Sequence, residues 1–282
     1  MSDVIAVVGA GQMGNGIAHV CAAAGLPVTM IDVSADALAR GRGTIEKNLE
    51  RQVKKGTLDA AARDATLGRI ATSTDLGAVA TATFAIEAAT EDPALKFRIF
   101  GDLDRLAGAG AILATNTSSI SITEIAAKTQ RPADVIGMHF MNPVPVMQLV
   151  EIIRGLATSD ATLQKTVALA TAVGKTPVEA SDYPGFIANR VLMPMINEAV
   201  YCVMEGVGTP EAVDTVMKLG MNHPMGPLAL ADLIGLDTCV AILDVLHHGL
   251  GDPKYRACPL LRKYVAAGWL GRKSGRGFYE YK

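Results

Sequence analysis

Three polar side chains, His139, Asn142 and Glu151, stand in the otherwise apolar segment HFMNPVPVMQLVEI. Buried imidazole, amide and carboxylate groups are costly unless they bond to one another or take part in chemistry. An imidazole titrates near neutral pH and can accept the proton of a substrate hydroxyl. A carboxylate on its other ring nitrogen would fix the tautomer and raise the basicity. The segment therefore fits a general base, His139, oriented by Glu151. The alternative is a core histidine bonded to backbone.

The segment GAGQMG places Gly9, Gly11 and Gly14 in the spacing of a dinucleotide-binding turn. The first glycine permits a tight turn, the second lets a pyrophosphate approach the backbone, and the third allows a helix to pack closely on a strand. Gln12 and Met13 complete the turn, so we count them among the cofactor-binding residues.

A carboxylate follows the turn at a matching distance. Asp32 closes the apolar run PVTMID, 23 positions after Gly9, where it can accept hydrogen bonds from an adenosine ribose. It would repel a ribose 2′-phosphate, which favours NAD over NADP, although Arg40 and Arg42 lie nearby in the sequence. The alternative is a structural glycine turn with a solvated Asp32. The strand, the spacing and the carboxylate together favour a dinucleotide.

Polar groups also stand at two other predicted element ends. The segment TNTSS, residues 115–119, follows the apolar run AILA, and Asn189 falls in the first turns of a predicted helix. Either group alone is more often a cap or a turn, because Ser, Thr and Asn favour such positions.

Short apolar runs alternate with helical segments through the first part of the chain. Runs at 4–8 and 27–32 flank an alanine-rich helical stretch that ends at Gly25, which is the pattern of a βαβ unit. Further strand candidates are RIATS, FAIEA, AILAT and DVIGMHF, giving at least six. Continuous apolar strands separated by helices indicate a parallel sheet covered on both faces. The fold class is therefore α/β with a Rossmann-like doubly wound sheet, in which ligands gather at carboxyl strand ends such as that of His139.

A long insertion, residues 34–67, follows the second strand candidate. Ser34 is a candidate helix N-cap, and Gly56-Thr57 is a break between two predicted helices. The insertion is therefore predicted to be a helical hairpin.

Helical periodicity replaces strand runs from residue 181 onward. We place a boundary near Tyr183-Pro184. It separates a dinucleotide-binding domain, residues 1–183, from a smaller all-helical domain, residues 184–282, expected to serve substrate binding and dimerisation. The helical domain is more apolar than its own core needs, so burial against a second subunit is expected.

The bulk composition excludes several classes of protein. A chain of 282 residues, half of them hydrophobic and 19% charged, suits two globular domains. A net charge of −2 supplies no general attraction to nucleic acid or to anionic membranes. The sequence predicts neither a membrane span nor a secretory signal. Four scattered cysteines suggest neither zinc nor disulfides and fit a reducing cytoplasm.

Together these segments resemble the short-chain L-3-hydroxyacyl-coenzyme A dehydrogenases, in particular those acting on 3-hydroxybutyryl-CoA. The resemblance covers nearly the whole chain and is carried by VIAVVGAGQMGNGIA, ATNTSSISI, GMHFMNPVPVMQLVEII, DYPGFIANRVLMPMINEA, HPMGPLALADLIGLD and GRKSGRGFYEYK. It implies an NAD-dependent oxidoreductase of fatty acid metabolism that interconverts (S)-3-hydroxyacyl-CoA and 3-ketoacyl-CoA. It further implies a cytoplasmic homodimer that needs no metal.

The resemblance also implies roles for individual residues. His139 would be the general base and Glu151 would orient it, while Ser118 and Asn189 would contact the hydroxyl or thioester region of the substrate. The other implied cofactor contacts are Asp32 at the adenosine ribose, Glu91 and Lys96 toward the nicotinamide, Asn142 beside it, and Asn116. Family members usually have Asn after this glutamate, whereas this chain has Asp92.

The insertion offers a coenzyme A site. Lys47, Arg51, Lys54 and Lys55 recur at near-helical spacing, so they share a helix face and could meet the coenzyme's phosphates. A solvated basic face explains the spacing equally well. The resemblance favours Arg51 and above all Lys54 as contacts.

Two other functions stay open at this point. Other NAD dehydrogenases with a Rossmann domain followed by helices act on hydroxy acids or sugar nucleotides, but they usually rely on lysine or cysteine. A non-catalytic NAD(H)-binding protein could use the same scaffold. It would have no need of His139, Glu151, Ser118 and Asn189 together.

Overall fold

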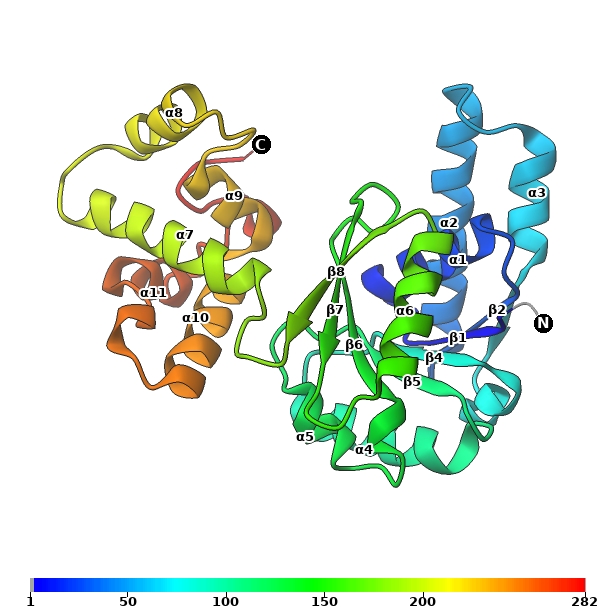
Figure 1. The fold of residues 1–282 in the computed structure, drawn as a ribbon. Helices are drawn as coiled ribbons and strands as arrows, with labels where there is room; N and C mark the ends of the chain where they lie inside the picture. Colours follow the sequence, from blue (N-terminus) through cyan, green and yellow to red (C-terminus); the bar gives the residue numbers. More distant parts are fainter. Residues whose placement is uncertain (1–2, 282) are drawn as a thin grey trace. The chain divides into compact units, whose positions relative to one another are not determined.

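The computed structural model describes residues 3–281, and the chain divides between Asp182 and Tyr183 into two compact units. The first unit is built on one eight-stranded sheet, and the second is helical (Figure 1). Within the described residues, no helix combines the length and the hydropathy that crossing a bilayer requires.

The sheet of the first unit has the strand order β3-β2-β1-β4-β5-β6-β7-β8. Its strands are β1 (Ile5–Val8), β2 (Val28–Ile31), β3 (Ile70–Ser73), β4 (Phe84–Glu87), β5 (Ile112–Thr115), β6 (Val135–Phe140), β7 (Leu149–Arg154) and β8 (Thr176–Ser181). Each of the six predicted strands is present. All four residues of β1 are buried, as the centre of a doubly wound sheet requires.

The strand directions change at one edge. Strands β1 to β6 pair in parallel, whereas β7 runs antiparallel to β6 and β8 runs parallel to β7. The predicted α/β class is confirmed, and the six predicted strands pair in parallel as expected. The antiparallel pairing involves β7, which with β8 was not among the predicted strands. A parallel crossover needs a dozen or more residues, and only the turn 141–148 separates β6 from β7. Strand β8 is mostly exposed, so it lacks the apolar run that marks the others.

Helices cover both faces of this sheet. Those of the first unit are α1 (Gln12–Ala23), α2 (Ala35–Lys54), α3 (Ala60–Gly68), α4 (Pro93–Leu106), α5 (Ile122–Ala126) and α6 (Asp160–Ala172), with short 3-10 turns η1 (Leu76–Thr81) and η2 (Pro132–Asp134). Ile17 of α1, Ile45 of α2 and Leu169 of α6 share one apolar cluster with Met138 of β6. A Cβ on Gly137 would lie 2.9 Å from a methyl of Ile122. Because successive strand residues point to opposite faces, α5 packs on the face opposite that cluster.

The insertion is a pair of helices, α2 and α3, that lie side by side (Figure 1). The Ser34 hydroxyl caps α2 by accepting from the backbone N–H of Ala37 at 3.2 Å. Between the helices Gly56 adopts a φ of +70°, which favours glycine. The predicted cap and the predicted break are therefore both present.

The second unit is a small helical domain. Its elements are α7 (Ala188–Met204), α8 (Pro210–Gly220), α9 (Pro227–Ile234), α10 (Leu236–Leu250) and α11 (Pro259–Ala266), with η3 (Pro253–Tyr255) and η4 (Arg272–Ser274). The buried Asp232 carboxylate of α9 accepts from the backbone N–H groups of Phe278 and Tyr279, each at 3.0 Å. This carboxylate therefore ties the end of the chain to the helical core.

Candidate active site

An imidazole and a carboxylate meet across the antiparallel edge of the sheet. The register of β6 and β7 sets His139 directly opposite Glu151, and His139 Nδ1 lies 2.8 Å from Glu151 Oε2. Both residues are buried: 7% of the surface of His139 and 1% of the surface of Glu151 is exposed. Directly opposed residues of neighbouring strands have side chains within contact distance. The strand register therefore creates this pair.

The glycine turn between β1 and α1 has the steric requirements expected of it. Gly9 has a φ of +109°, and a Cβ there would lie 2.6 Å from the carbonyl oxygen of Ala88. A Cβ on Gly14 would lie 1.8 Å from the carbonyl oxygen of Gly9. Gly11, in contrast, has no atom within 4 Å of the Cβ position. The turn thus leaves space at the position where a pyrophosphate would approach a helix N-terminus.

Asp32 lies just beyond β2 and bonds to the same turn. Its Oδ2 accepts from the backbone N–H of Ala10 at 2.8 Å, and its Oδ1 accepts from that of Ser34 at 3.0 Å. Each carboxylate oxygen has a further lone pair, which a ribose hydroxyl could use. Asp32 also lines a cavity of about 480 Å³ whose other walls include Leu76 and Ile99. A carboxylate beside apolar walls suits an adenosine.

The two arginines near Asp32 in the sequence lie elsewhere. The Arg42 guanidinium donates to the backbone carbonyl oxygen of Ile70 at 2.7 Å. Arg40 lines a different cavity, of about 410 Å³. The cavity beside Asp32 is lined by Arg98 instead, from α4.

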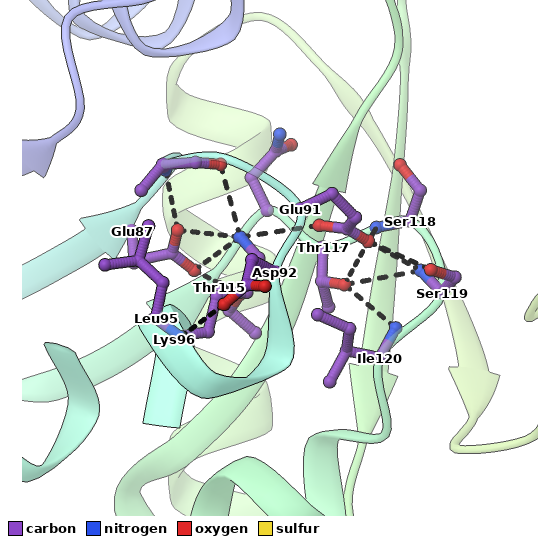
Figure 2. A network of polar contacts seen from close by, with 12 residues as sticks. Glu87, Glu91, Asp92, Leu95, Lys96, Thr115, Thr117, Ser118, Ser119 and Ile120 are labelled. Atoms are coloured by element: carbon purple, nitrogen blue, oxygen red, sulfur yellow. Dashed lines mark hydrogen bonds and ion pairs between the residues drawn. The ribbon is translucent and has the colours of Figure 1, made fainter. Parts of the chain in front are cut away.

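A network of polar contacts joins the segment after β4 to the segment after β5 (Figure 2). Lys96 Nζ of α4 lies 2.7 Å from Glu87 Oε1 and 3.5 Å from Glu91 Oε2. The hydroxyl of Thr115 also donates to Glu87, at 2.7 Å. Lys96 and Glu87 are both fully buried. A buried ion pair is retained only where hydrogen bonds satisfy both charges, and this network supplies them.

Glu91 organises the segment that carries Ser118. Its Oε1 accepts from the Thr117 hydroxyl at 2.6 Å, from the backbone N–H of Ser118 at 2.8 Å and from that of Ser119 at 3.1 Å (Figure 2). Asp92, where the resemblance implies Asn, caps α4 by accepting from the backbone N–H of Leu95 at 2.7 Å. Both Asp and Asn make such caps, so the departure leaves the local structure intact.

Two asparagines link the strand ends to one another. Asn116 Oδ1 accepts from the backbone N–H of Phe140 at 2.8 Å, which joins the ends of β5 and β6. Asn142 Oδ1 accepts from Gln12 Nε2 at 3.0 Å, so the turn after β6 bonds to the glycine turn. Met13 packs against the apolar core beneath α1. Gln12 and Asn142 both line the cavity of about 410 Å³.

The same cavity reaches α2, but not through the predicted basic residues. Arg40, Thr44 and Asn48 of α2 line it, whereas Arg51 and Lys54 are exposed on the helix surface. Asn48 and Glu87 have no counterpart among the residues predicted from the sequence. For Glu87 the available signal was an acidic residue at the end of a buried strand, with a lysine nine positions later.

The remaining predicted residue belongs to the second unit. Asn189 lies in the first turn of α7, and its backbone N–H donates to the carbonyl oxygen of Gly185 at 3.1 Å. Within residues 3–281 no group of three or more His, Cys, Asp and Glu side chains is arranged to hold a metal ion.

Both units of the chain match the domains of one known protein family. Residues 4–183 match the family described as 3-hydroxyacyl-CoA dehydrogenase, NAD binding domain, and residues 185–281 match the 3-hydroxyacyl-CoA dehydrogenase C-terminal domain. The chain belongs to the 3-hydroxyacyl-CoA dehydrogenase family. The family resemblance expected from the sequence is therefore confirmed, and with it an NAD-binding oxidoreductase scaffold.

Individual relatives cover almost the whole chain. A protein of Bacillus subtilis (strain 168) named "Probable 3-hydroxybutyryl-CoA dehydrogenase" is 60% identical over 99% of this chain and 97% of its own length. The 3-hydroxybutyryl-CoA dehydrogenase of Bradyrhizobium diazoefficiens is 55% identical over 99% of this chain and 95% of its own. The crystal structure of (S)-3-hydroxybutyryl-CoA dehydrogenase from Ralstonia eutropha, 51% identical, covers 100% of both chains with a TM-score of 0.98.

Proposed function

We propose that this member of the 3-hydroxyacyl-CoA dehydrogenase family interconverts (S)-3-hydroxyacyl-CoA, chiefly 3-hydroxybutyryl-CoA, and 3-ketoacyl-CoA with NAD(H). The observation that carries the proposal is the 2.8 Å contact between His139 Nδ1 and Glu151 Oε2. It lies at the carboxyl edge of a sheet whose first turn has the glycines of a dinucleotide site. The relatives named above support the substrate class.

We assign cofactor binding to residues 1–183, and substrate binding and dimerisation to residues 184–282. The backbone at Gly11 and the N-terminus of α1 would hold the pyrophosphate, and Asp32 the adenosine ribose. NAD, when bound, supplies the hydride acceptor for the alcohol. Asn116 and Asn142 would border the nicotinamide, with Glu91 and Lys96 behind them. The carboxylate at Asp32 favours NAD over NADP.

His139 is proposed as the general base. With the Nδ1 proton directed at Glu151, Nε2 carries the lone pair and can accept the proton of the 3-hydroxyl group. The carboxylate then stabilises the imidazolium that forms. Running in reverse, the imidazolium returns the proton to the 3-keto oxygen. The chain's own groups thus handle the proton in both directions.

Ser118 and Asn189 are proposed to contact the hydroxyl or thioester region of the substrate. Glu91 supports this role for Ser118, because a carboxylate that accepts from the Ser118 backbone at 2.8 Å fixes where its side chain begins. Donors held in place can stabilise an oxygen as charge develops on it. The coenzyme's phosphates would meet the exposed basic face of α2 at Arg51 and Lys54.

The purified protein is expected to oxidise NADH with acetoacetyl-CoA, and to do so poorly with NADPH. Replacing His139 by Gln removes the proton acceptor and should lower kcat by about 10²- to 10⁴-fold with little change in NADH binding. Steady-state absorbance at 340 nm measures turnover, and protein fluorescence measures NADH binding. Turnover by His139→Gln at the wild-type rate would refute the proposed base.

Replacing Glu151 by Gln should cost less, about tenfold in kcat, and should alter the pH dependence of kcat. The amide still fits the space opposite His139 but has no charge with which to stabilise an imidazolium. The control is Glu124→Gln, which neutralises an exposed carboxylate on α5. A pH-rate profile identical to that of the wild type would count against the orienting role.

Reversing the charge of Lys54 should raise KM for acetoacetyl-CoA by about 3- to 10-fold, the size expected for an exposed phosphate contact. The free acid acetoacetate has no phosphates, so its turnover should not change. The matched control is Lys165→Glu, which reverses the charge of an exposed lysine on α6. Equal effects of Lys54→Glu on the thioester and on the free acid would reject the contact.

A homodimer formed through the helical domain is proposed from its exposed apolar side chains. Leu219 of α8 is 83% exposed, Val207 is 74% exposed and Met221 is 62% exposed. Large apolar side chains that are exposed in the single chain can be buried against a second copy.

Light scattering after gel filtration should therefore give twice the 29.5 kDa mass of the chain. Leu219→Glu should give the monomer, because a charge on the buried interface is costly. Leu156→Glu, on an exposed residue of the first unit, should stay dimeric. A monomeric wild-type protein at micromolar concentration would contradict this assignment.

A further inference from the structure

The turn between β6 and β7, residues 141–148, is held in place by residues that lie outside it. It carries Asn142 and follows His139 by two residues, yet Val146 and Met147 are exposed, and only Val144 is buried among its apolar side chains. Its internal hydrogen bonds are those from the N–H groups of Val146 and Met147 to the carbonyl oxygen of Pro143, each 3.0 Å. Such a segment needs a neighbour to fix its position.

Lys175 is that neighbour. Its ammonium donates to the backbone carbonyl oxygen of Val144 at 2.5 Å and to that of Met147 at 2.7 Å. The two acceptors span the turn, so one side chain fixes both of its arms. The lysine backbone is itself anchored, because its N–H donates to the carbonyl oxygen of Ala170 at 2.9 Å at the end of α6.

The charge of Lys175 has no partner of opposite sign in the described part of the chain, since no carboxylate forms an ion pair with it there. Burial, with the charge of Lys175 as a second cause, lowers the pKa of His19 to about 4. Burial raises the pKa of the nearby Cys21 thiol to about 12. Both neighbours are therefore neutral at pH 7. Burial lowers the pKa of Lys175 itself. The hydrogen bonds of its ammonium to the carbonyl oxygens of Val144 and Met147 are charge-assisted.

The turn also meets helix α1 at close range. A Cβ on Gly16 of α1 would lie 2.8 Å from Cβ of Val144, so the turn packs against the helix backbone itself. Asn142 then reaches Gln12 of the glycine turn through the 3.0 Å hydrogen bond. A shift of the turn 141–148 would therefore also displace residues of the glycine turn.

We infer that Lys175 is a positioning residue of the reaction: it pins the turn 141–148 against α1 and so places Asn142 at the cofactor. The inference rests on the proposed function for its catalytic consequence. Its consequence for cofactor binding rests on the hydrogen bonds of the turn together with the proposed place of Asn142 beside the nicotinamide.

The first test replaces Lys175 by Met, which keeps the length of the side chain and removes its donors. We expect KM for NADH to rise about tenfold and kcat to fall about tenfold, with KM for acetoacetyl-CoA changed less than about twofold. Lys175→Arg restores donors and charge and should return both constants to within about threefold of the wild type. Lys165→Met on α6 is the control and should match the wild type. Values for Lys175→Met within twofold of the wild type would overturn the inference.

A double-mutant cycle distinguishes positioning from a general loss of structure. If Lys175 acts through the turn, the variant with both Lys175→Met and Asn142→Ala should bind NADH no more weakly than the worse single variant. Losses that multiply would show that the two residues act independently, against the inference. Thermal melting verifies folding, and if the Met variant does not fold, Lys175→Leu, which also lacks donors, takes its place with the same expectations.

Equilibrium NADH binding separates this inference from the proposed function. Measured by fluorescence without any thioester, the dissociation constant of Lys175→Met should rise about tenfold. A wild-type protein that binds NADH but leaves acetoacetyl-CoA unreduced would contradict the proposed function alone. Unchanged NADH binding by Lys175→Met, beside an active wild type, would contradict the inference alone.

Discussion

The antiparallel register of β6 and β7 is the constraint on which the site depends. It sets His139 opposite Glu151, with 2.8 Å between Nδ1 and Oε2. Side chains alternate between the two faces of a strand, so a slip of one residue would send the carboxylate to the other face and bring a buried apolar side chain opposite the imidazole. The short turn 141–148 prevents such a slip. The geometry of this pair and the pairing of the sheet are in this sense a single feature.

Buried cations hold the segments that leave the carboxyl ends of the strands. Lys96 binds Glu87 and Glu91 behind the segment after β5, and Lys175 binds two carbonyl groups of the turn after β6. Segments that follow strands are ordinarily the more mobile parts of a fold. Charge-assisted hydrogen bonds in a low dielectric are strong and directional. They hold these two segments in fixed positions next to the strand ends.

Features with a local steric cause could be predicted from the sequence, and features with a distant cause could not. Gly9 and Gly14 have no room for a side chain, so their spacing alone indicates the turn. His139 and Glu151 stand out by residue type alone, but their contact arises from an antiparallel pairing that the α/β pattern did not predict. In the sequence Glu87 is indistinguishable from an ordinary residue at the end of a strand. Its role becomes visible only in the structure, where it pairs with the Lys96 ammonium.

The contacts of Glu91 limit what Lys96 can do. Four donors from residues 117–119 converge on Oε1 of Glu91. The other oxygen of Glu91, Oε2, lies 3.5 Å from the Lys96 ammonium. The side chain of Lys96 is only 1% exposed, whereas that of Glu91 is 39% exposed. The geometry therefore favours an indirect role for the lysine, in which it fixes the charge and the orientation of Glu91, and through Glu91 the backbone of Ser118.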